Sequence, residues 1–305
     1  MHTHTWKSYV LLMMVVGLLP STASAASIYF ETSRNTISVG DTVILTAKID
    51  AEDTTINSVE GDVVLDQSSS TVVVNDFSLA KSVFSLWPRT PSLSADGNTI
   101  SFVGGVPGGF DLNNAVLFSV IVEAQKEGAL TVSPKNIAIY ANDGKGTRVA
   151  VNPKSLTITV SPKNEAIAPT NEWESLVGAD KTNPEPFTIV IGKDASLFEG
   201  RRFAFFTAVD NQSGISYYEV SEDGGPAIRS GSMYVLQNQD EQVTPLLTVT
   251  AYDKAGNKTV SVYTEPSTRI FGVSLPMIIG GVILIIIALL FILKKRKNNL
   301  NAQKN

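Results

Sequence analysis

Hydrophobic and polar residues alternate along many short runs between residues 26 and 160. The clearest examples are TVILTAKID, residues 42–50, and VEGDVVLD, residues 59–66, in which every second residue is apolar or glycine. This period of two is typical of a strand with one buried face. Similar runs predict further strands at 27–31, 71–74, 99–103, 116–123, 129–133, 137–140 and 155–160. About nine strands with no helical period between them predict a two-sheet antiparallel sandwich over residues 26–160.

A second strand-rich stretch covers residues 186–265. Its segments TAVDNQSGISYYEV and TAYDKAGNK resemble the paired motifs of bacterial immunoglobulin-like or fibronectin-like repeats, in which an Asp closes a strand before a glycine-containing turn. We therefore expect a smaller Ig-like β-sandwich here. Residues 161–185 are rich in Pro, Asn and charge without a sustained period, and are interpreted as a linker. Within it, Trp173 either docks on a neighbouring domain or belongs to a short helix.

Both ends of the chain carry membrane-related patterns. Residues 1–25 combine Lys7, a short apolar core and an Ala-Ser-Ala cleavage sequence, as in a secretory signal peptide. Residues 273–293 are apolar and uncharged, and a helix of this length spans the roughly 30 Å hydrocarbon core of a bilayer. KKRK opens the tail of residues 294–305, and basic flanks of a span stay in the cytoplasm. The patterns predict a single-pass protein of the cytoplasmic membrane, with its N-terminal domains extracellular and its C-terminus cytoplasmic.

Composition narrows the classes of function. Once Lys7 and the five basic residues of the tail are set aside, 18 basic side chains oppose all 29 acidic ones, and the exported part has a net charge of −11. A surface this acidic repels nucleic acid. Cysteine is absent, and both histidines, His2 and His4, lie within the predicted signal peptide. The mature chain therefore lacks the residues of a Ser/His/Asp triad, a Cys/His pair or a histidine-ligated zinc site. We predict a protein that is not an enzyme and has no cofactor.

The sequence SFVGGVPGGFD, residues 101–111, holds four glycines in six positions. A phosphate-binding glycine loop leads from a strand into a helix and has GxGxxG or GK[ST] spacing. Neither spacing is present, and the next predicted element is a strand at 116–123. The glycines and Pro107 are therefore interpreted as a tight surface crossover.

Six segments of the first sandwich occur in the order seen in cohesin domains, so that residues 27–160 resemble the cohesin-like ectodomains of bacterial surface proteins. The segments are ISVGDTVILTAKID, INSVEGDVVLD, FSLWP, NTISFVGGVPGGF, LFSVIVEAQKEGALTVS and IYANDGKGT. The resemblance implies a nine-stranded jelly roll, related to carbohydrate-binding modules, whose partner is a dockerin. It also implies that Glu60 and Asp62 face that partner from the outer side of their strand, although Ser58 and Gln67 differ from the family's frequent residues. The alternative is that both carboxylates only solvate an exposed sheet face.

Trp87, in FSLWP, is the second candidate binding residue. An exposed indole can stack on a sugar ring, which makes carbohydrate binding the alternative function. Equally, Trp87 can cover the end of the sandwich core together with Phe84 and Leu86. The sequence thus predicts a membrane-anchored extracellular protein for binding or display that docks a dockerin-like module. Polysaccharide binding and a passive adhesin or stalk are the alternatives.

Acidic residues in two regions are candidate calcium ligands. The segment ANDGKGT, residues 141–147, lacks the spaced carboxylates of an EF-hand and is interpreted as a hairpin turn. Asp210 and Asp253 either ligate Ca²⁺ at one end of the second sandwich or cap their turns. Capping is the simpler interpretation, and no metal ligand is assigned.

Overall fold

The computed structural model describes residues 25–67, 71–263, 269–270 and 273–274. Residues 1–24 of the predicted signal peptide, residues 275–293 of the predicted span and the basic tail lie outside the described residues. Val273 and Ser274, the first two residues of the predicted span, form strand β21. No helix within the described ranges is long and apolar enough to cross a membrane.

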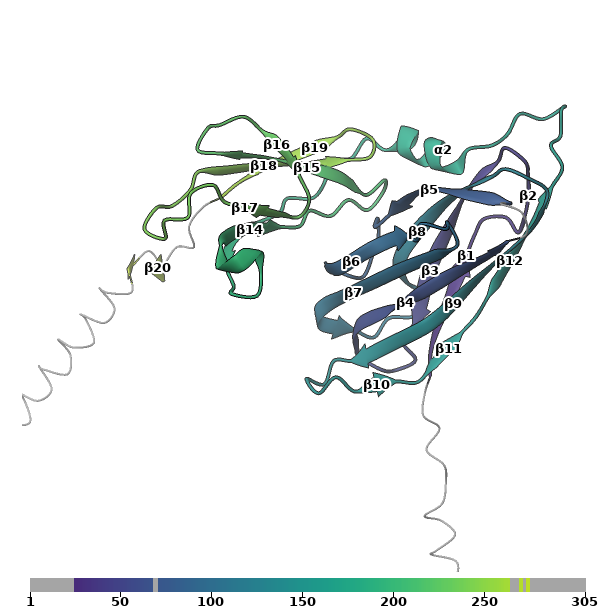
Figure 1. Ribbon diagram of the computed structural model, residues 1–305, viewed down its shortest axis with the longest axis horizontal. Coiled ribbons are helices and arrows are strands. Elements are labelled where there is room, and N and C mark those ends of the chain that lie inside the picture. Colours follow the sequence, from purple (N-terminus) through teal and green to yellow (C-terminus); the bar gives the residue numbers. More distant parts are fainter. Residues whose placement is uncertain (1–24, 68–70, 264–268, 271–272, 275–305) are drawn as a thin grey trace, which may run out of the picture. The chain divides into compact units, whose positions relative to one another are not determined.

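The first sandwich consists of two sheets (Figure 1). The five-stranded sheet has the order β11-β1-β3-β8-β5, and the seven-stranded sheet has the order β2-β12-β9-β4-β7-β6 with β10 paired to β9. The strands of the first sheet are β1 Ala26–Glu31, β3 Thr42–Asp50, β5 Val72–Ser78, β8 Ala115–Ala124 and β11 Val151–Pro153. Those of the second are β2 Thr36–Ser38, β4 Ile56–Gln67, β6 Leu86–Leu93, β7 Thr99–Phe110, β9 Gly128–Ala141, β10 Arg148–Val149 and β12 Leu156–Ser161.

The long strands of this sandwich pair antiparallel, as the sequence predicts. Two short pairs at the sheet edges are parallel, β1 with β11 and β2 with β12. The all-β prediction for residues 26–160 is confirmed, and the purely antiparallel pairing is corrected by these two edge pairs.

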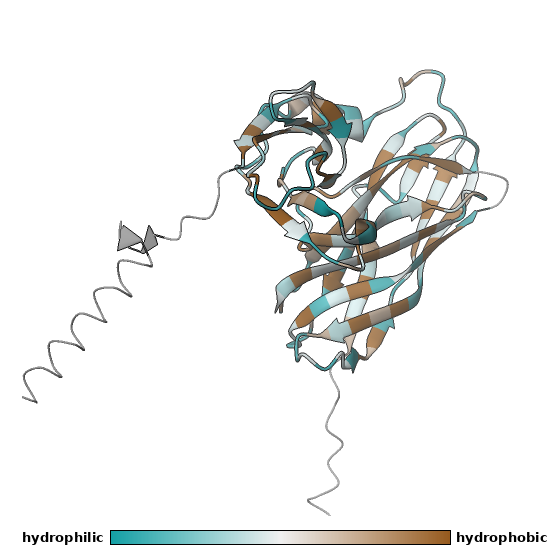
Figure 2. Cartoon of the chain, turned by 60° about the vertical axis from the view of Figure 1, so that its left-hand side comes forward, coloured by the Kyte–Doolittle hydropathy of each residue, from teal (hydrophilic) through white to brown (hydrophobic). Residues whose placement is uncertain are grey.

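The core of the first sandwich lies between its sheets and follows from the alternation. Val59, Val63 and Leu65 of β4 are buried, and the aromatic rings of Phe102 and Phe118 meet at 4.9 Å between centroids. Figure 2 shows the alternation as brown and teal bands along the strands. Where a strand buries every second residue, as β4 does from Val59 to Leu65, a shift of one residue would expose its core side chains, so burial fixes the register.

Several strands differ from the sequence-based prediction. The short strands β2, β10 and β11, of two or three residues each, had no predicted counterpart. β6 was not expected, because its sequence LWPRTPSL contains two prolines; it lies at the edge of its sheet, where proline is tolerated. β9 runs through both segments predicted at 129–133 and 137–140. The glycine-rich stretch is part of β7 and not a surface crossover.

The glycines of β7 are needed for two different reasons. A Cβ atom on Gly104 would lie 2.4 Å from Cδ2 of Phe84. The Phe84 ring lies so close to the backbone here that no side chain fits. Gly108 and Gly109 have φ of +86° and +72°, a region that favours glycine.

The second sandwich is a three-stranded sheet, β13-β14-β17, and a four-stranded sheet, β16-β15-β18-β19, with antiparallel pairing. A 3₁₀ turn covers Phe198–Gly200. Phe206, Val220 and Val249 are fully buried between the sheets. A separate two-stranded sheet pairs β20, Arg269–Ile270, with β21, Val273–Ser274. The sandwich strands are β13 Ile189–Lys193, β14 Arg202–Phe206, β15 Ile215–Glu222, β16 Ile228–Ser230, β17 Met233–Val235, β18 Leu247–Asp253 and β19 Lys258–Val262.

The predicted linker contains a helix, α2, from Glu172 to Ala179, which includes Trp173. Asn171 caps its N-terminus by accepting a hydrogen bond from the backbone N–H of Glu174 at 2.9 Å. The acidic residues of the first turn, Glu172 and Glu174, stabilise the N-terminus of the helix, because the helix dipole is positive there. The start of the helix and the residues before it are held on the first sandwich: Arg34 forms an ion pair with Glu172, and the backbone N–H of Thr170 donates to Asp41 Oδ1 at 2.7 Å.

Candidate functional site

The two acidic residues predicted to face a partner lie in the middle of the seven-stranded sheet. Glu60 and Asp62 are on β4, which is hydrogen-bonded to β7 on one side and to β9 on the other. Their neighbours Val59 and Val63 are fully buried, whereas Glu60 and Asp62 are partly exposed. Both carboxylates therefore lie on the outer side of β4, and their contact with a partner stays a prediction.

Side chains on the flanking strands hold both carboxylates in place. Oε1 of Glu60 accepts a hydrogen bond from the Tyr140 hydroxyl at 2.7 Å. Asp62 accepts one from the Ser101 hydroxyl at 2.7 Å and one from the Asn136 amide at 2.9 Å. Because these donors come from β7 and β9, the three strands form one hydrogen-bonded surface, which we call the β4 face.

The hydrogen bonds of Asp62 also set its protonation. Donation by Asn136 and by Ser101 lowers the pKa of Asp62 below its usual value, and the positive charge of Arg89 acts in the same direction. Asp62 is therefore ionised well into acidic solution. The Oε2 atom of Glu60 accepts no hydrogen bond among the described residues and remains available to a donor from outside.

Trp87 lies on β6 and is only partly buried. Its indole packs edge to face against Phe84, at 5.4 Å between ring centroids, and against Phe118, at 6.4 Å. It belongs to the residues packed against the core of the first sandwich. This placement favours the interpretation of Trp87 as a core-covering residue, and carbohydrate binding stays a prediction.

The turn at residues 141–147 joins β9 to β10, as expected for a hairpin. Asp143 accepts hydrogen bonds from the backbone N–H of Lys145, at 2.9 Å, and from the hydroxyl of Thr147. Both acceptor oxygens are thus used inside the turn, in agreement with the hairpin interpretation.

Asp210 and Asp253 cap their turns, as the sequence indicates. Oδ1 of Asp210 accepts hydrogen bonds from the backbone N–H groups of Gln212, Ser213 and Gly214, at 3.1, 2.8 and 2.7 Å. Asp253, the last residue of β18, accepts from the backbone and side-chain nitrogens of Asn257 at 2.8 Å each.

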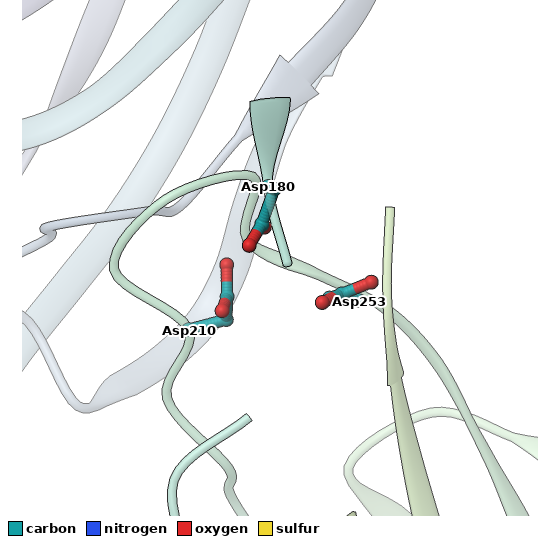
Figure 3. A group of neighbouring side chains, drawn as sticks. All are labelled: Asp180, Asp210 and Asp253. Atoms are coloured by element: carbon teal, nitrogen blue, oxygen red, sulfur yellow. The ribbon is translucent and has the colours of Figure 1, made fainter. Parts of the chain in front are cut away.

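A third carboxylate, that of Asp180 at the C-terminal end of α2, lies beside these two. Asp180, Asp210 and Asp253 each offer an oxygen atom within 4.8 Å of the others, and all three residues are buried. Figure 3 shows that they come from three separate segments of the chain and gather at one place. The turn holding Asp210 leads directly into Ile215, which pairs with Asp253 across the sheet, and this pairing brings the two turns together.

Asp180 follows helix α2 and is fixed on the second sandwich by its own hydrogen bonds. Its Oδ1 accepts from the backbone N–H and the hydroxyl of Thr182, and its Oδ2 accepts from the backbone N–H of Ser213 at 3.2 Å. Burial acts to raise the pKa of Asp180, but the hydrogen bonds from Ser213 and Thr182 outweigh it and the pKa is lowered. Sequence reasoning missed this residue; the one available signal was an Asp two positions before Thr182, the pattern of a capped turn.

Comparisons with known proteins find cohesin modules among solved structures. A type I cohesin from Pseudobacteroides cellulosolvens is 14% identical, covers 47% of this chain and 97% of its own, and has a TM-score of 0.40. A non-cellulosomal cohesin from Archaeoglobus fulgidus is 18% identical over 47% of this chain and 96% of its own, with a TM-score of 0.35. A type I cohesin–dockerin complex from Clostridium thermocellum is 13% identical over 47% of this chain and 99% of its own, with a TM-score of 0.37. No family model and no curated protein matches the chain.

Proposed function

We propose that the first sandwich is a docking module for an extracellular protein, and that the partner binds the β4 face around Glu60 and Asp62. The observation that supports this most directly is the placement of two partly exposed carboxylates at the centre of a sheet, each held by donors from the neighbouring strands. Groups that are already ordered lose little conformational freedom on binding, so more of their interaction energy is available for affinity.

The chemistry of the β4 face suits a protein partner that presents hydrogen-bond donors, including basic side chains. Glu60 keeps Oε2 free of hydrogen bonds among the described residues, and Asp62 is ionised at neutral pH. The exported part of the chain is also acidic overall, which favours encounter with a basic partner. The resemblance of residues 27–160 to cohesin domains makes a dockerin-like module the partner we propose.

The test compares binding by matched variants of residues 26–263. We expect the double substitution Glu60→Gln and Asp62→Asn to weaken capture of the partner at least tenfold, because it removes both charges with little change of shape. Glu123→Gln on β8 is the control, since Glu123 is a carboxylate of the other sheet that also accepts hydrogen bonds from amide side chains. Equal capture by the double variant and the wild type would contradict docking on the β4 face.

Carbohydrate binding through Trp87 is the alternative function, and the same protein tests it. Trp87→Ala should abolish retention on an insoluble polysaccharide and leave protein capture intact if this alternative is right. If the variant and the wild type are retained equally, Trp87 has only its packing role. If neither a protein nor a polysaccharide binds, the remaining alternative is a passive adhesin or stalk.

The proposal includes anchoring at the cytoplasmic membrane, with residues 26–270 extracellular and the C-terminus cytoplasmic. Its support is the signal-peptide pattern of residues 1–25, the uncharged apolar run 273–293 and the basic residues that follow. Protease added to intact cells should digest both sandwiches and leave a short C-terminal fragment in the membrane. A C-terminal epitope removed by the same treatment would contradict this orientation.

A further inference from the structure

A groove lies between helix α2 and the outer face of the five-stranded sheet. Its volume is about 460 Å³, and sites for small molecules occupy about 300–1,000 Å³. Ile44 and Thr46 of β3 and Ser119 of β8 line it from the sheet, and Trp173 and Leu176 line it from the helix. No residue of α2 is buried, so the helix covers this face without closing onto it.

Hydrogen bonds hold the start of α2 on the sheet beside the groove. Oε2 of Glu172 accepts from the backbone N–H of Ile44 at 3.3 Å, and Oε1 accepts from Nε of Arg34 at 3.3 Å. Just before the helix, the backbone N–H of Thr42 donates to the carbonyl of Thr170 at 2.8 Å. Sheet and helix therefore form one hydrogen-bonded unit, and a ligand would meet walls that are already ordered.

The groove combines an indole ring with hydroxyl groups. Trp173 is partly exposed; Nζ of Lys254 lies 5.5 Å from its ring centroid but does not line the groove, so the indole borders the groove with another part of its surface. The hydroxyls of Thr46 and Ser119 hydrogen-bond to each other at 3.2 Å and keep capacity for further bonds. A sugar ring uses both kinds of surface, because its C–H groups pack on an aromatic ring and its hydroxyls donate and accept.

One atom of a lining residue lacks a hydrogen bond. Oγ1 of Thr32 is the only buried side-chain nitrogen or oxygen without a partner among the described residues. Thr32 lines the groove and is partly exposed as a whole, so a rotation about χ1 can turn its hydroxyl to the groove. A buried hydroxyl without a partner is unfavourable, and a polar ligand in the groove would supply the missing partner.

The charged residues of the groove leave one cation unpaired. Glu31 pairs with Lys48, and Glu172 pairs with Arg34. Lys81 also lines the groove, is exposed, and forms no ion pair within the described part of the chain. An anionic group on a ligand would therefore find a free partner in Lys81, while the two existing pairs stay intact.

The position of the groove argues against an extended peptide as the ligand. A peptide that binds by strand addition needs the free edge of a sheet. β3 and β8 are both interior strands in the order β11-β1-β3-β8-β5, so their backbone groups are already paired. Recognition in the groove therefore depends on side chains, which here are an indole, hydroxyls and one free ammonium group.

We infer that this groove binds an acidic sugar residue of an oligosaccharide. Trp173 packs on the sugar ring, Thr32 and Thr46 bond to its hydroxyls, and Lys81 pairs with its carboxylate. The groove lies on the sheet opposite to the β4 face, so a docked protein and a sugar can be bound at the same time. It is also separate from Trp87, which lies on β6 of the other sheet.

The first experiment applies the full-length protein to an array of immobilised neutral and acidic oligosaccharides. We expect retention on oligosaccharides that contain a uronic or sialic acid. Trp173→Ala should weaken binding at least tenfold, because truncation of a central aromatic residue usually has a large effect, and Trp173→Phe should keep most of the binding. Lys81→Gln should remove the preference for acidic sugars. No retention of the wild type, retention of neutral sugars only, or equal binding by Trp173→Ala would each overturn the inference.

The matched control for Lys81→Gln is Lys126→Gln on the same sandwich. Lys126 is an exposed lysine that does not line the groove, so its variant should bind as the wild type does. Glu60→Gln with Asp62→Asn should also bind the sugar normally, which distinguishes failure of this site from failure of docking on the β4 face. Loss of sugar binding in Trp87→Ala but not in Trp173→Ala would place the sugar at Trp87 and overturn the inference.

A second variant separates a binding role of Thr32 from a structural one. Thr32→Val keeps the shape of the side chain and removes the unpaired hydroxyl, so without sugar it should melt at the same or a higher temperature than the wild type. Titration with the best oligosaccharide of the array, followed by calorimetry, should show weaker binding than in the wild type. A lower melting temperature together with unchanged sugar binding would show that the hydroxyl serves only the fold, and would count against the inference.

Discussion

The glycine-rich strand β7 offers a quantitative test of how the first sandwich is packed. In Gly104→Ala, the new Cβ would lie 2.4 Å from Cδ2 of Phe84 and 3.0 Å from Cζ3 of Trp87. Carbon atoms in favourable contact are about 3.5–4.0 Å apart, so the Phe84 ring must move by roughly 1 Å or more. Phe84 is 5% exposed, and its ring also packs on Phe110 at 6.0 Å between centroids. The movement therefore disturbs the packing of three aromatic rings.

We expect Gly104→Ala to lower the free energy of unfolding by about 1–3 kcal/mol, the usual cost of overpacking a core. The melting temperature should fall by about 3–9 °C for a domain of this size. Urea unfolding of residues 26–263, followed by tryptophan fluorescence, measures the change, and Trp87 reports from the site itself. Gly178→Ala in α2 is the control, because its Cβ would meet nothing within 4 Å. There alanine should be neutral or stabilising by up to about 1 kcal/mol.

A second substitution identifies the cause of the loss. Replacing Phe84 by Leu in the Gly104→Ala background removes the ring atoms that the new methyl group meets. The two substitutions together should therefore cost less than the sum of their separate effects. Strict additivity, or a Gly104→Ala variant as stable as Gly178→Ala, would refute the argument that Gly104 is required by the approach of Phe84.

Three further predictions follow from individual contacts. The pKa of Asp62 is lower in the folded state than in the unfolded state, where it is about 3.9. Ionised Asp62 therefore stabilises the folded state fully above that unfolded pKa, and the stabilisation is lost as pH falls through the folded pKa. Asp62→Asn should flatten the dependence of the melting temperature on pH below about 4. Tyr218→Phe removes the hydroxyl that accepts the buried backbone N–H of Ala208 at 2.9 Å, and should destabilise the second sandwich by about 1–3 kcal/mol in denaturant titrations. Arg34→Ala removes the ion pair with Glu172, and limited proteolysis should then cut residues 162–171 faster.

Most long strands could be predicted because each has one buried face. β3 alternates from Val43 to Ile49, and β4 alternates from Val59 to Leu65, so the sequence indicates both the strand and the side that enters the core. The resemblance to cohesin domains implied that Glu60 and Asp62 lie on the outer face, which agrees with this alternation. Their hydrogen bonds to Tyr140 and Asn136 could not be predicted, because β9 pairs with β4 only in the folded sheet.

The strands and the helix that the sequence analysis missed depend on features that a local pattern of apolar residues does not show. β6 contains prolines that are acceptable only because the strand lies at a sheet edge, a position set by the whole fold. β9 continues past Asn136, whose φ of 50° interrupts the alternation between the two runs. Helix α2 has too few apolar residues for a clear period, although Asn171 followed by Glu174 is a recognisable N-terminal cap.

Two of the three aspartates in the cluster were noted from the sequence, and the third was missed because its place depends on the folded chain. Asp210 and Asp253 close strands before glycine-containing turns, a pattern that is visible in the sequence. Asp180 lies in a stretch interpreted as a linker, 30 residues before Asp210, and joins the other two only because the chain folds back after α2. The grouping of the three carboxylates therefore exists only in the folded chain.

The most direct test of the account is the effect of the β4 face on binding to an identified partner. Immobilised residues 26–263 are exposed to the exported proteins of the source cells in wild-type form, as Glu60→Gln with Asp62→Asn, and as Glu123→Gln. The account predicts one partner, retained by the wild type and by Glu123→Gln and lost from the Glu60 and Asp62 variant. A partner retained equally by all three forms would contradict docking on the β4 face.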